Sequence, residues 1–228
     1  MATKFEAVLD YRTVQQLVTE RIRAAILDGT LKPNQAINQA DLARRLNVSR
    51  IPTREALRTL EGEGLIKSQP HRKVVVATMT VEEIRDVYAI RAVLEVKAAV
   101  GALKQITPQR INVMRELQQK MNSEADPDRW SKLNNDFHLA LYQREGAARL
   151  LMVIEMLRNW VAGYVRLLVS DPEHRRLANA DHARILKAVE SRSAKRLRTA
   201  IDHHLRTSCD GVVSSLWNTA LANHIRQR

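Results

Sequence analysis

The sequence predicts a mostly α-helical protein in two parts: three helices with a short β-hairpin in residues 1–79, and an all-helical bundle in residues 80–228. The chain has only 7 Gly and 6 Pro, and aromatic residues make up 4% of it. Because sandwiches and barrels need frequent turns and strands rich in aromatic or β-branched residues, a mostly β fold is disfavoured. The boundary is predicted near residue 79, since Thr80-Val81-Glu82-Glu83 has the pattern of a capping box that opens a long helix.

The net charge of +12 favours a polyanion or an anionic surface as partner, without deciding between them. Cys209 is the one cysteine, which excludes an intrachain disulfide and fits a reducing compartment. No apolar run reaches the roughly 18 residues of a membrane span, and the segment from Met1 to Asp10 lacks the apolar core of a signal peptide. We therefore expect a cytoplasmic protein that does not enter a membrane.

The first part is predicted from local start and stop signals. Apolar residues recur at helical spacing from Val14 to Ile26, and Gly29 ends that stripe. Asn38 and Ser49 each precede a short amphipathic run and are suited to cap a helix. Two β-rich runs follow and are expected to pair as a hairpin. The expected elements are helices over 13–28, 39–46 and 50–62 and strands over 65–68 and 73–77.

Two short helices joined by the turn Asn47-Val48-Ser49-Arg50 and followed by a hairpin are typical of a winged helix-turn-helix. In this fold the second helix enters the DNA major groove with its N-terminal residues toward the base edges. At roughly 100° per residue, Ala56, Leu57 and Leu60 define the buried side of the 50–62 helix. Thr53 falls on the same side. The side chains left outside are Ser49, Arg50, Ile51, Arg54 and Arg58.

These outward side chains suit a DNA-reading surface. The fork of an arginine such as Arg50 or Arg54 can donate to both acceptors of guanine. Ser49 and the free amides of the first turn suit a phosphate, and Ile51 suits a thymine methyl. The alternative stays open that the arginines form a solvated charged face and the hairpin tip an ordinary polar turn. Candidates for a phosphate or minor-groove contact at that tip are His71, Arg72 and Lys73.

Several segments of the first part form one long, ordered motif. They are Ile26-Leu27-Asp28-Gly29-Thr30-Leu31-Lys32-Pro33, Asp41-Leu42-Ala43, Val48-Ser49-Arg50-Ile51-Pro52-Thr53-Arg54-Glu55-Ala56-Leu57-Arg58-Thr59-Leu60-Glu61 and Glu63-Gly64-Leu65-Ile66. With these segments, residues 14–77 resemble the GntR family of bacterial transcription regulators. Ile51 replaces the usual Thr, Thr53 replaces an apolar residue, and Lys73 replaces a wing glycine. A buried Thr53 then requires a local hydrogen-bond partner.

Helical periodicity continues through the second part, where six helices are expected. Pro108 after Thr107 marks a helix start, and Asp171-Pro172 marks a break. Such a bundle leaves a central cavity only where polar residues point inward. The expected helices span 81–104, 108–124, 127–145, 147–170, 177–191 and 193–222.

Four polar side chains are predicted to point into this bundle. His182 lies within an apolar stripe and His204 on the apolar face of its helix, whereas His203 points away. Asn134 and His138 are four residues apart and share one face. Three imidazoles and one amide can converge on one divalent cation, for which imidazole favours zinc or nickel. The alternative is a set of ordinary core histidines, because no H-x-x-x-H or C-x-x-C spacing supports a metal.

A second set of segments extends over residues 84–210. They are Arg91-Ala92-Val93-Leu94-Glu95, Asn134-Asn135-Asp136-Phe137-His138, Asp181-His182-Ala183-Arg184-Ile185-Leu186-Lys187-Ala188 and His204-Leu205. With them this part resembles the FCD effector domain of the FadR subfamily. The resemblance implies a divalent metal held by one Asp or Asn and three His. Those positions fall on Asn134, His138, His182 and His204, with Asn in place of the commoner Asp.

The same resemblance implies a small carboxylate effector beside the metal, with Arg91 placed near its pocket. Arginine can bind a carboxylate bidentately. The alternative is a helix pair between Arg91 and Glu95 at i+4, and both interpretations stay open. Tyr164 and Arg166, on the expected 147–170 helix, are further pocket candidates.

We therefore predict a homodimeric, sequence-specific DNA-binding regulator that acts as a repressor and senses a small molecule. Dimerisation is expected because two half-sites multiply the discrimination of one short helix. One alternative is a metal-dependent hydrolase or lyase built on the three histidines, but no convincing general base is found: Asp136 points away, and the positions of Glu155 and Asp181 relative to the histidines are not predicted. Another is an RNA-binding or nucleoid protein with little sequence preference.

Overall fold

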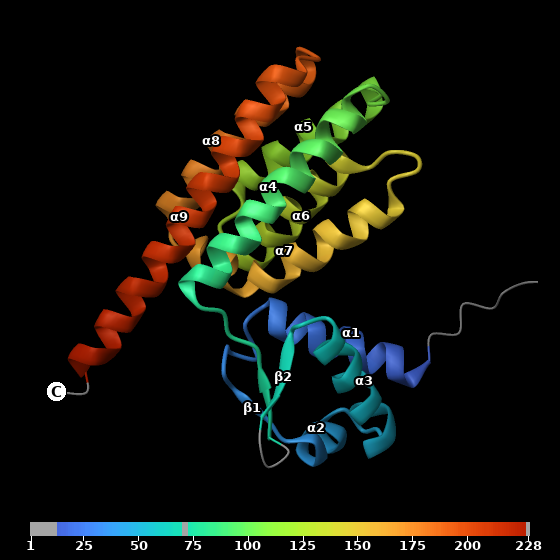
Figure 1. The fold of residues 1–228 in the computed structure, drawn as a ribbon, viewed down its shortest axis with the longest axis vertical. Helices are drawn as coiled ribbons and strands as arrows, with labels where there is room; N and C mark the ends of the chain where they lie inside the picture. The colour runs from blue at the N-terminus through green and yellow to red at the C-terminus, as the bar shows by residue number, and fades with distance from the viewer. Residues whose placement is uncertain (1–12, 70–72, 227–228) are drawn as a thin grey trace, which may run out of the picture. The chain divides into compact units, whose positions relative to one another are not determined.

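The computed structural model describes residues 13–69 and 73–226, and the chain divides into two compact units. One unit ends at Thr78 and the other begins at Met79. Most of the described residues are helical, which confirms the predicted fold class (Figure 1). None of the described helices combines the length and the apolar content that a membrane crossing requires.

The first unit is a winged helix-turn-helix, as the sequence predicts. Its three strands are antiparallel in the order β1-β3-β2, with Ile66 opposite Val76 in the hairpin. The hairpin agrees with the expectation, whereas β1 carries no sequence signal, because two residues are too few to show alternation. The elements are α1 (Val14–Leu27), β1 (Ala36–Ile37), α2 (Gln39–Arg45), α3 (Arg50–Gly62), β2 (Ile66–Gln69) and β3 (Lys73–Val76).

The turn between α2 and α3 is held by a Schellman motif. Asn47 has a φ of 54°, in the left-handed region that asparagine tolerates better than most residues. The Asn47 amide donates to the Arg44 carbonyl at 3.1 Å, and the Val48 amide donates to the Ala43 carbonyl at 3.0 Å. These bonds satisfy the last carbonyls of α2 and set the direction in which α3 leaves the turn.

Substitutions of Asn47 test this turn. A β-branched side chain at positive φ costs about 1–2 kcal/mol. Asn47→Val should therefore lower the free energy of unfolding of the first unit by that amount, whereas Asn47→Gly should change it by only a few tenths of a kcal/mol. Urea unfolding followed by circular dichroism measures both. Equal stability of the two variants would contradict the left-handed assignment.

The second unit is a bundle of the helices α4 to α9 (Figure 1). The Thr80 side chain accepts from the Glu83 amide and the Glu83 side chain accepts from the Thr80 amide, so the predicted capping box opens α4. Pro108 occupies the first turn of α5, where a missing N–H costs nothing. The helices are α4 (Val81–Leu103), α5 (Pro108–Ser123), α6 (Pro127–Tyr142), α7 (Ala148–Leu168), α8 (Pro172–Glu190) and α9 (Ala194–Arg226).

The start of α8 differs from the expectation of a helix from residue 177. Asp171 caps the helix by accepting from the Glu173 amide at 3.0 Å, and Pro172 follows at the first helical position. The Asp-Pro pair therefore begins the helix at once, because proline is tolerated in a first turn and its φ is already helical. The break that the sequence predicts is only the short link after α7.

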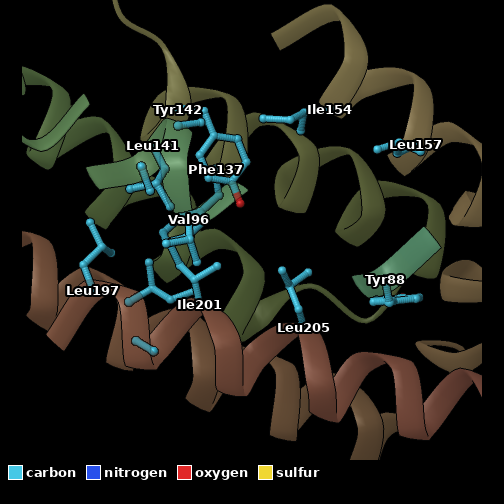
Figure 2. Packing of buried hydrophobic residues seen from close by; sticks show 14 of the residues in the cluster. Tyr88, Val96, Phe137, Leu141, Tyr142, Ile154, Leu157, Leu197, Ile201 and Leu205 are labelled. Carbon is cyan, nitrogen blue, oxygen red and sulfur yellow. The ribbon is translucent and has the colours of Figure 1, made fainter. Parts of the chain in front are cut away.

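One apolar core runs through the bundle. Trp130 and Phe137 of α6 are almost completely buried in it. Leu197, Ile201 and Leu205 lie along one side of α9 and face the bundle interior (Figure 2). This spacing of four residues is the helical periodicity from which α9 is predicted. The same face carries His204 inward, so the packing of α9 also positions a candidate ligand.

Candidate functional site

The N-terminal end of α3 presents a cationic surface. The side chains of Arg50, Arg54 and Arg58 are exposed, and Ile51 is 66% exposed. The closest ion pair of Arg54, with Glu55, is long at 3.7 Å and lies at the surface. Surface pairs of this kind are weak, so the guanidinium stays available.

Thr53 and Ser49 have complementary roles at this helix end. Thr53 is fully buried, and its hydroxyl donates to the Ser49 carbonyl at 3.1 Å. This is the local partner that a buried threonine requires. Ser49 holds the N-cap position, but its side chain makes no capping hydrogen bond. The exposed Ser49 hydroxyl therefore remains free to bind another group.

The hairpin tip is only partly described. Lys73 is exposed at the first position of β3. His71 and Arg72 lie outside the described residues.

Three histidines from three helices meet inside the bundle. His138 of α6, His182 of α8 and His204 of α9 are all buried. The ring centroid of His138 lies 5.2 Å from the centroids of His182 and of His204. The ring centroids of His182 and His204 are 4.8 Å apart. One nitrogen from each ring lies within 4.8 Å of the others. A cation with nitrogen ligands at 2.0–2.1 Å needs them about 3.3 Å apart, so a small inward movement closes the set.

Several nitrogens of this cluster are buried without a hydrogen-bond partner among the described residues. They are Nε2 of His138, both ring nitrogens of His182, and Nδ1 of His204. Burial and the nearby positive charge of Arg158 lower the pKa of His138 well below its usual value, and burial does the same to the pKa of His182. The rings of His138 and His182 are therefore neutral, which is the form that binds a metal.

A cavity of about 360 Å³ adjoins the cluster. Asn134, His138 and His204 all contribute to its lining. Arg91 and Arg158 also line it. The guanidinium of Arg184 and the carboxylate of Asp181 belong to the same lining.

Arg91 makes the pair that the sequence offers as the alternative. Its Nε donates to Glu95 Oε1 at 2.8 Å, with both side chains buried. Arg158 lies 3.9 Å from the other carboxylate oxygen. Burial alone would raise the pKa of Glu95, but Arg91, Arg158 and a hydrogen bond from Tyr142 outweigh it and lower the pKa. Arg91 therefore both lines the cavity and neutralises a buried carboxylate.

Two of the predicted pocket residues lie away from the cavity. The Tyr164 hydroxyl accepts from the Met79 amide at 2.9 Å, and Tyr164 does not belong to the cavity lining. Arg166 pairs with Asp128 and is also absent from the lining. Val161 and Val165 of α7 line the cavity instead. They are four residues apart and therefore lie on the same face of the helix.

Arg158 and Asp181 also line the cavity, although neither is among the residues predicted for it. Arg158 has a helical-spacing signal, since it falls three residues before Val161 in the buried stripe of α7. Asp181 precedes His182 on α8 and accepts from the Thr207 hydroxyl at 2.7 Å. Burial would raise the pKa of Asp181, but His204, Thr207 and His203 outweigh it and lower the pKa to about 2.

No general base stands free beside the three histidines among the described residues. Asp136 is exposed on α6, which agrees with its predicted outward direction, and Glu155 is exposed on α7. Asp181 is held by Arg184 and by Thr207.

Comparisons with known proteins agree with this architecture. Residues 14–76 match the family of bacterial regulatory proteins named gntR, and residues 86–207 match the FCD domain. YdhC of Bacillus subtilis, an uncharacterised HTH-type transcriptional regulator, is 26% identical over 68% of this chain and 70% of its own length. The transcriptional repressor RspR of Escherichia coli is 29% identical over 57% of this chain and 58% of its own length.

McbR of Escherichia coli, an HTH-type transcriptional regulator, is similar in sequence and in structure. Its sequence is 30% identical over 58% of this chain and 61% of its own length. The solved structure of McbR/YncC superposes with a TM-score of 0.79 at 22% identity, covering 90% of this chain and all of that one. The structural likeness establishes the shared fold. The chain therefore belongs to the bacterial regulators that join a gntR-family DNA-binding domain to an FCD domain, and it is a transcriptional regulator rather than an enzyme.

Proposed function

We propose that the protein is a cytoplasmic repressor that binds operator DNA as a homodimer and is controlled by a small carboxylate held beside a divalent metal. Residues 1–79 read the DNA, and residues 80–228 bind the effector and dimerise. The observation that carries the proposal is the cluster of buried histidine nitrogens that have no hydrogen-bond partner among the described residues, beside a cavity lined by arginines. Repression is supported by the likeness to RspR, whose name describes a repressor.

The DNA-reading part rests on the exposed end of α3. Arg50 and Arg54 are exposed at the N-terminal end of α3, which is the helix that enters the major groove in this fold. Their guanidinium groups fit the two acceptors of guanine. The unengaged Ser49 hydroxyl fits a phosphate. One such helix reads few base pairs, so a dimer with two half-sites is needed for operator-level discrimination.

Arg54→Ala tests base reading at this surface. Each bidentate base contact is worth about 1–3 kcal/mol, which corresponds to roughly 5- to 150-fold per operator half-site. We expect binding to an operator selected from random DNA to weaken at least tenfold, with a smaller loss on unselected DNA. Fluorescence anisotropy at fixed salt measures both affinities.

Arg21→Ala is the matched control, because Arg21 is an exposed arginine of α1 in the same unit. It removes the same charge and should affect both DNAs slightly and equally. Equal losses on operator and random DNA for Arg54→Ala would mean that Arg54 contacts only the phosphate backbone.

The metal part rests on the buried histidine nitrogens that have no hydrogen-bond partner among the described residues. Leaving a buried polar group without a partner costs about 1–3 kcal/mol. One cation coordinated by a nitrogen from each of His138, His182 and His204 would satisfy three such groups at once. Neutral imidazoles suit zinc and nickel, and the Asn134 amide oxygen is a further donor. These four ligands carry no charge, so the divalent cation keeps its full attraction for an anion.

The effector part rests on the charge around the cavity. Arg91 and Arg158 line it, and Arg184 and His203 line both the cavity and an adjoining groove of about 870 Å³. That groove adds the cations Lys187, Lys195, Arg196 and Arg206 and the acid Asp202. Such a surface raises the local concentration of an anion and speeds its entry. A carboxylate that bridges the metal and a guanidinium fits this arrangement.

Control of DNA binding would follow from a population shift. The effector can move the dimer only by binding one arrangement of its two DNA-reading units more tightly than the other. Elemental analysis together with native mass spectrometry of the purified protein tests the proposal. It should detect a divalent metal, a co-purified organic acid and a dimer. A metal-free protein that does not take up zinc or nickel would refute the metal site.

A further inference from the structure

We propose that Tyr142 and Glu95 fix His138 with its proton on Nδ1, so that Nε2 is the atom offered to the metal. This inference rests on the metal site of the proposed function. It makes Tyr142 a positioning residue, since its hydroxyl reaches the metal only through the His138 ring.

A chain of buried hydrogen bonds links His138 to Glu95 through Tyr142. The Tyr142 hydroxyl lies 2.9 Å from His138 Nδ1 and 2.5 Å from Glu95 Oε2. Glu95 Oε1 accepts from Arg91 Nε at 2.8 Å. His138 and Tyr142 are one helical turn apart on α6, whereas Glu95 comes from α4.

The direction of each bond follows from counting protons. Glu95 faces two arginines, so it is a carboxylate and can only accept. The single hydroxyl proton of Tyr142 is donated to Glu95. Toward His138 the same oxygen can then only accept, which requires a proton on Nδ1. A neutral imidazole with its proton on Nδ1 carries a lone pair on Nε2.

The opposite nitrogen of His138 is placed where a lone pair is needed. Nε2 is buried and has no hydrogen-bond partner among the described residues. The His138 ring lies 5.2 Å from the rings of His182 and His204, centroid to centroid. Metal-ligating histidines usually donate their other N–H to an oxygen, which fixes ring orientation and raises ligand basicity. The chain Glu95-Tyr142-His138 provides this support through a tyrosine.

This series of hydrogen bonds also extends to the cavity proposed for the effector. Arg91 holds Glu95 and lines the cavity at the same time. Arg91 thus contacts the Glu95 carboxylate that orients His138, and it also belongs to the cavity surface proposed to bind an anionic ligand. His182 shows no comparable support, because neither of its ring nitrogens has a hydrogen-bond partner in the described part of the chain. The ring orientation of His138 is therefore the best defined of the two.

Tyr142→Phe is the test, because it keeps the buried ring and removes only the hydroxyl. Loss of a partner of this kind lowers metal affinity by about 10- to 100-fold. We expect that loss for Zn²⁺, measured by competition with a chromophoric chelator. Tyr164→Phe is the matched control: it removes a hydroxyl bonded to the Met79 amide in the same bundle and should leave Zn²⁺ affinity unchanged.

A second readout needs no metal. Nitrogen-15 NMR of the imidazoles in the metal-free wild-type protein should place the His138 proton on Nδ1, and Tyr142→Phe should shift it toward Nε2. Wild-type binding of Zn²⁺ with an Nε2 proton on metal-free His138, or with equal affinity in Tyr142→Phe, would overturn this inference alone. Failure of the wild type to bind Zn²⁺ would overturn the proposed metal site itself, and with it the role of Nε2.

Discussion

Glu95→Ala should lower the free energy of unfolding of the helical bundle by about 3–5 kcal/mol. The Glu95 carboxylate is completely buried and faces Arg91 at 2.8 Å and Arg158 at 3.9 Å. Its removal leaves two guanidinium groups in the bundle interior without an anion, and the Tyr142 hydroxyl loses its acceptor. Uncompensated buried charge is among the most costly defects in a folded protein. Urea unfolding followed by circular dichroism measures the loss.

Glu190→Ala is the control for this prediction. Glu190 pairs with Arg115 at 2.7 Å, but both side chains are more than a third exposed. Exposed pairs contribute at most about 1 kcal/mol, so this variant should unfold almost like the wild type. Similar small losses in the two variants would show that water in the cavity solvates Arg91 and Arg158 well, and that Glu95 is not needed to neutralise them.

The double substitution His138→Ala plus His204→Ala should abolish uptake of Zn²⁺. It leaves only His182 and Asn134 of the four proposed ligands, too few to hold the cation. In the wild type, metal present at a hundredfold excess over its dissociation constant should stabilise the fold by about 2.7 kcal/mol. The double variant should gain nothing. Elemental analysis after dialysis against Zn²⁺ measures uptake, and thermal unfolding with and without Zn²⁺ measures the stabilisation.

His203→Ala provides the matched comparison, because His203 is adjacent in sequence to His204 but lies outside the cluster. It should keep full metal content and the full gain in stability. Circular dichroism and native mass spectrometry should show that the double variant is still a folded dimer. Metal content equal to that of the wild type would remove His138 and His204 from the site.

Much of the fold could be predicted from local sequence signals. The capping box at Thr80 and the apolar stripe of α9 both act within a few residues of chain. Such signals report backbone geometry directly, so the helices were predictable one by one. The start of α8 was misplaced because Asp-Pro is ambiguous: it breaks a preceding helix and caps a following one. Strand β1 was not predicted, because its two residues form a strand only by pairing with β3.

The candidate site could be predicted only in part. Helical spacing alone predicts that His138, His182 and His204 point inward, because the direction of each side chain depends only on its own helix. Arg158 and Asp181 were missed, and Tyr164 was placed in the pocket when its hydroxyl in fact bonds the Met79 amide. These differences depend on which helix lies opposite which, and no local pattern specifies that.

Local sequence patterns suffice to predict the helices, the winged helix-turn-helix with its outward arginines, and the inward helix faces that carry the histidines. The packing of the helices is what brings together three rings from α6, α8 and α9 and links Glu95 of α4 to His138 through Tyr142. The difference lies in the range of the interactions. Propensity, capping and periodicity act along a few turns of chain, whereas buried charges and lone pairs find their partners only across the packed core.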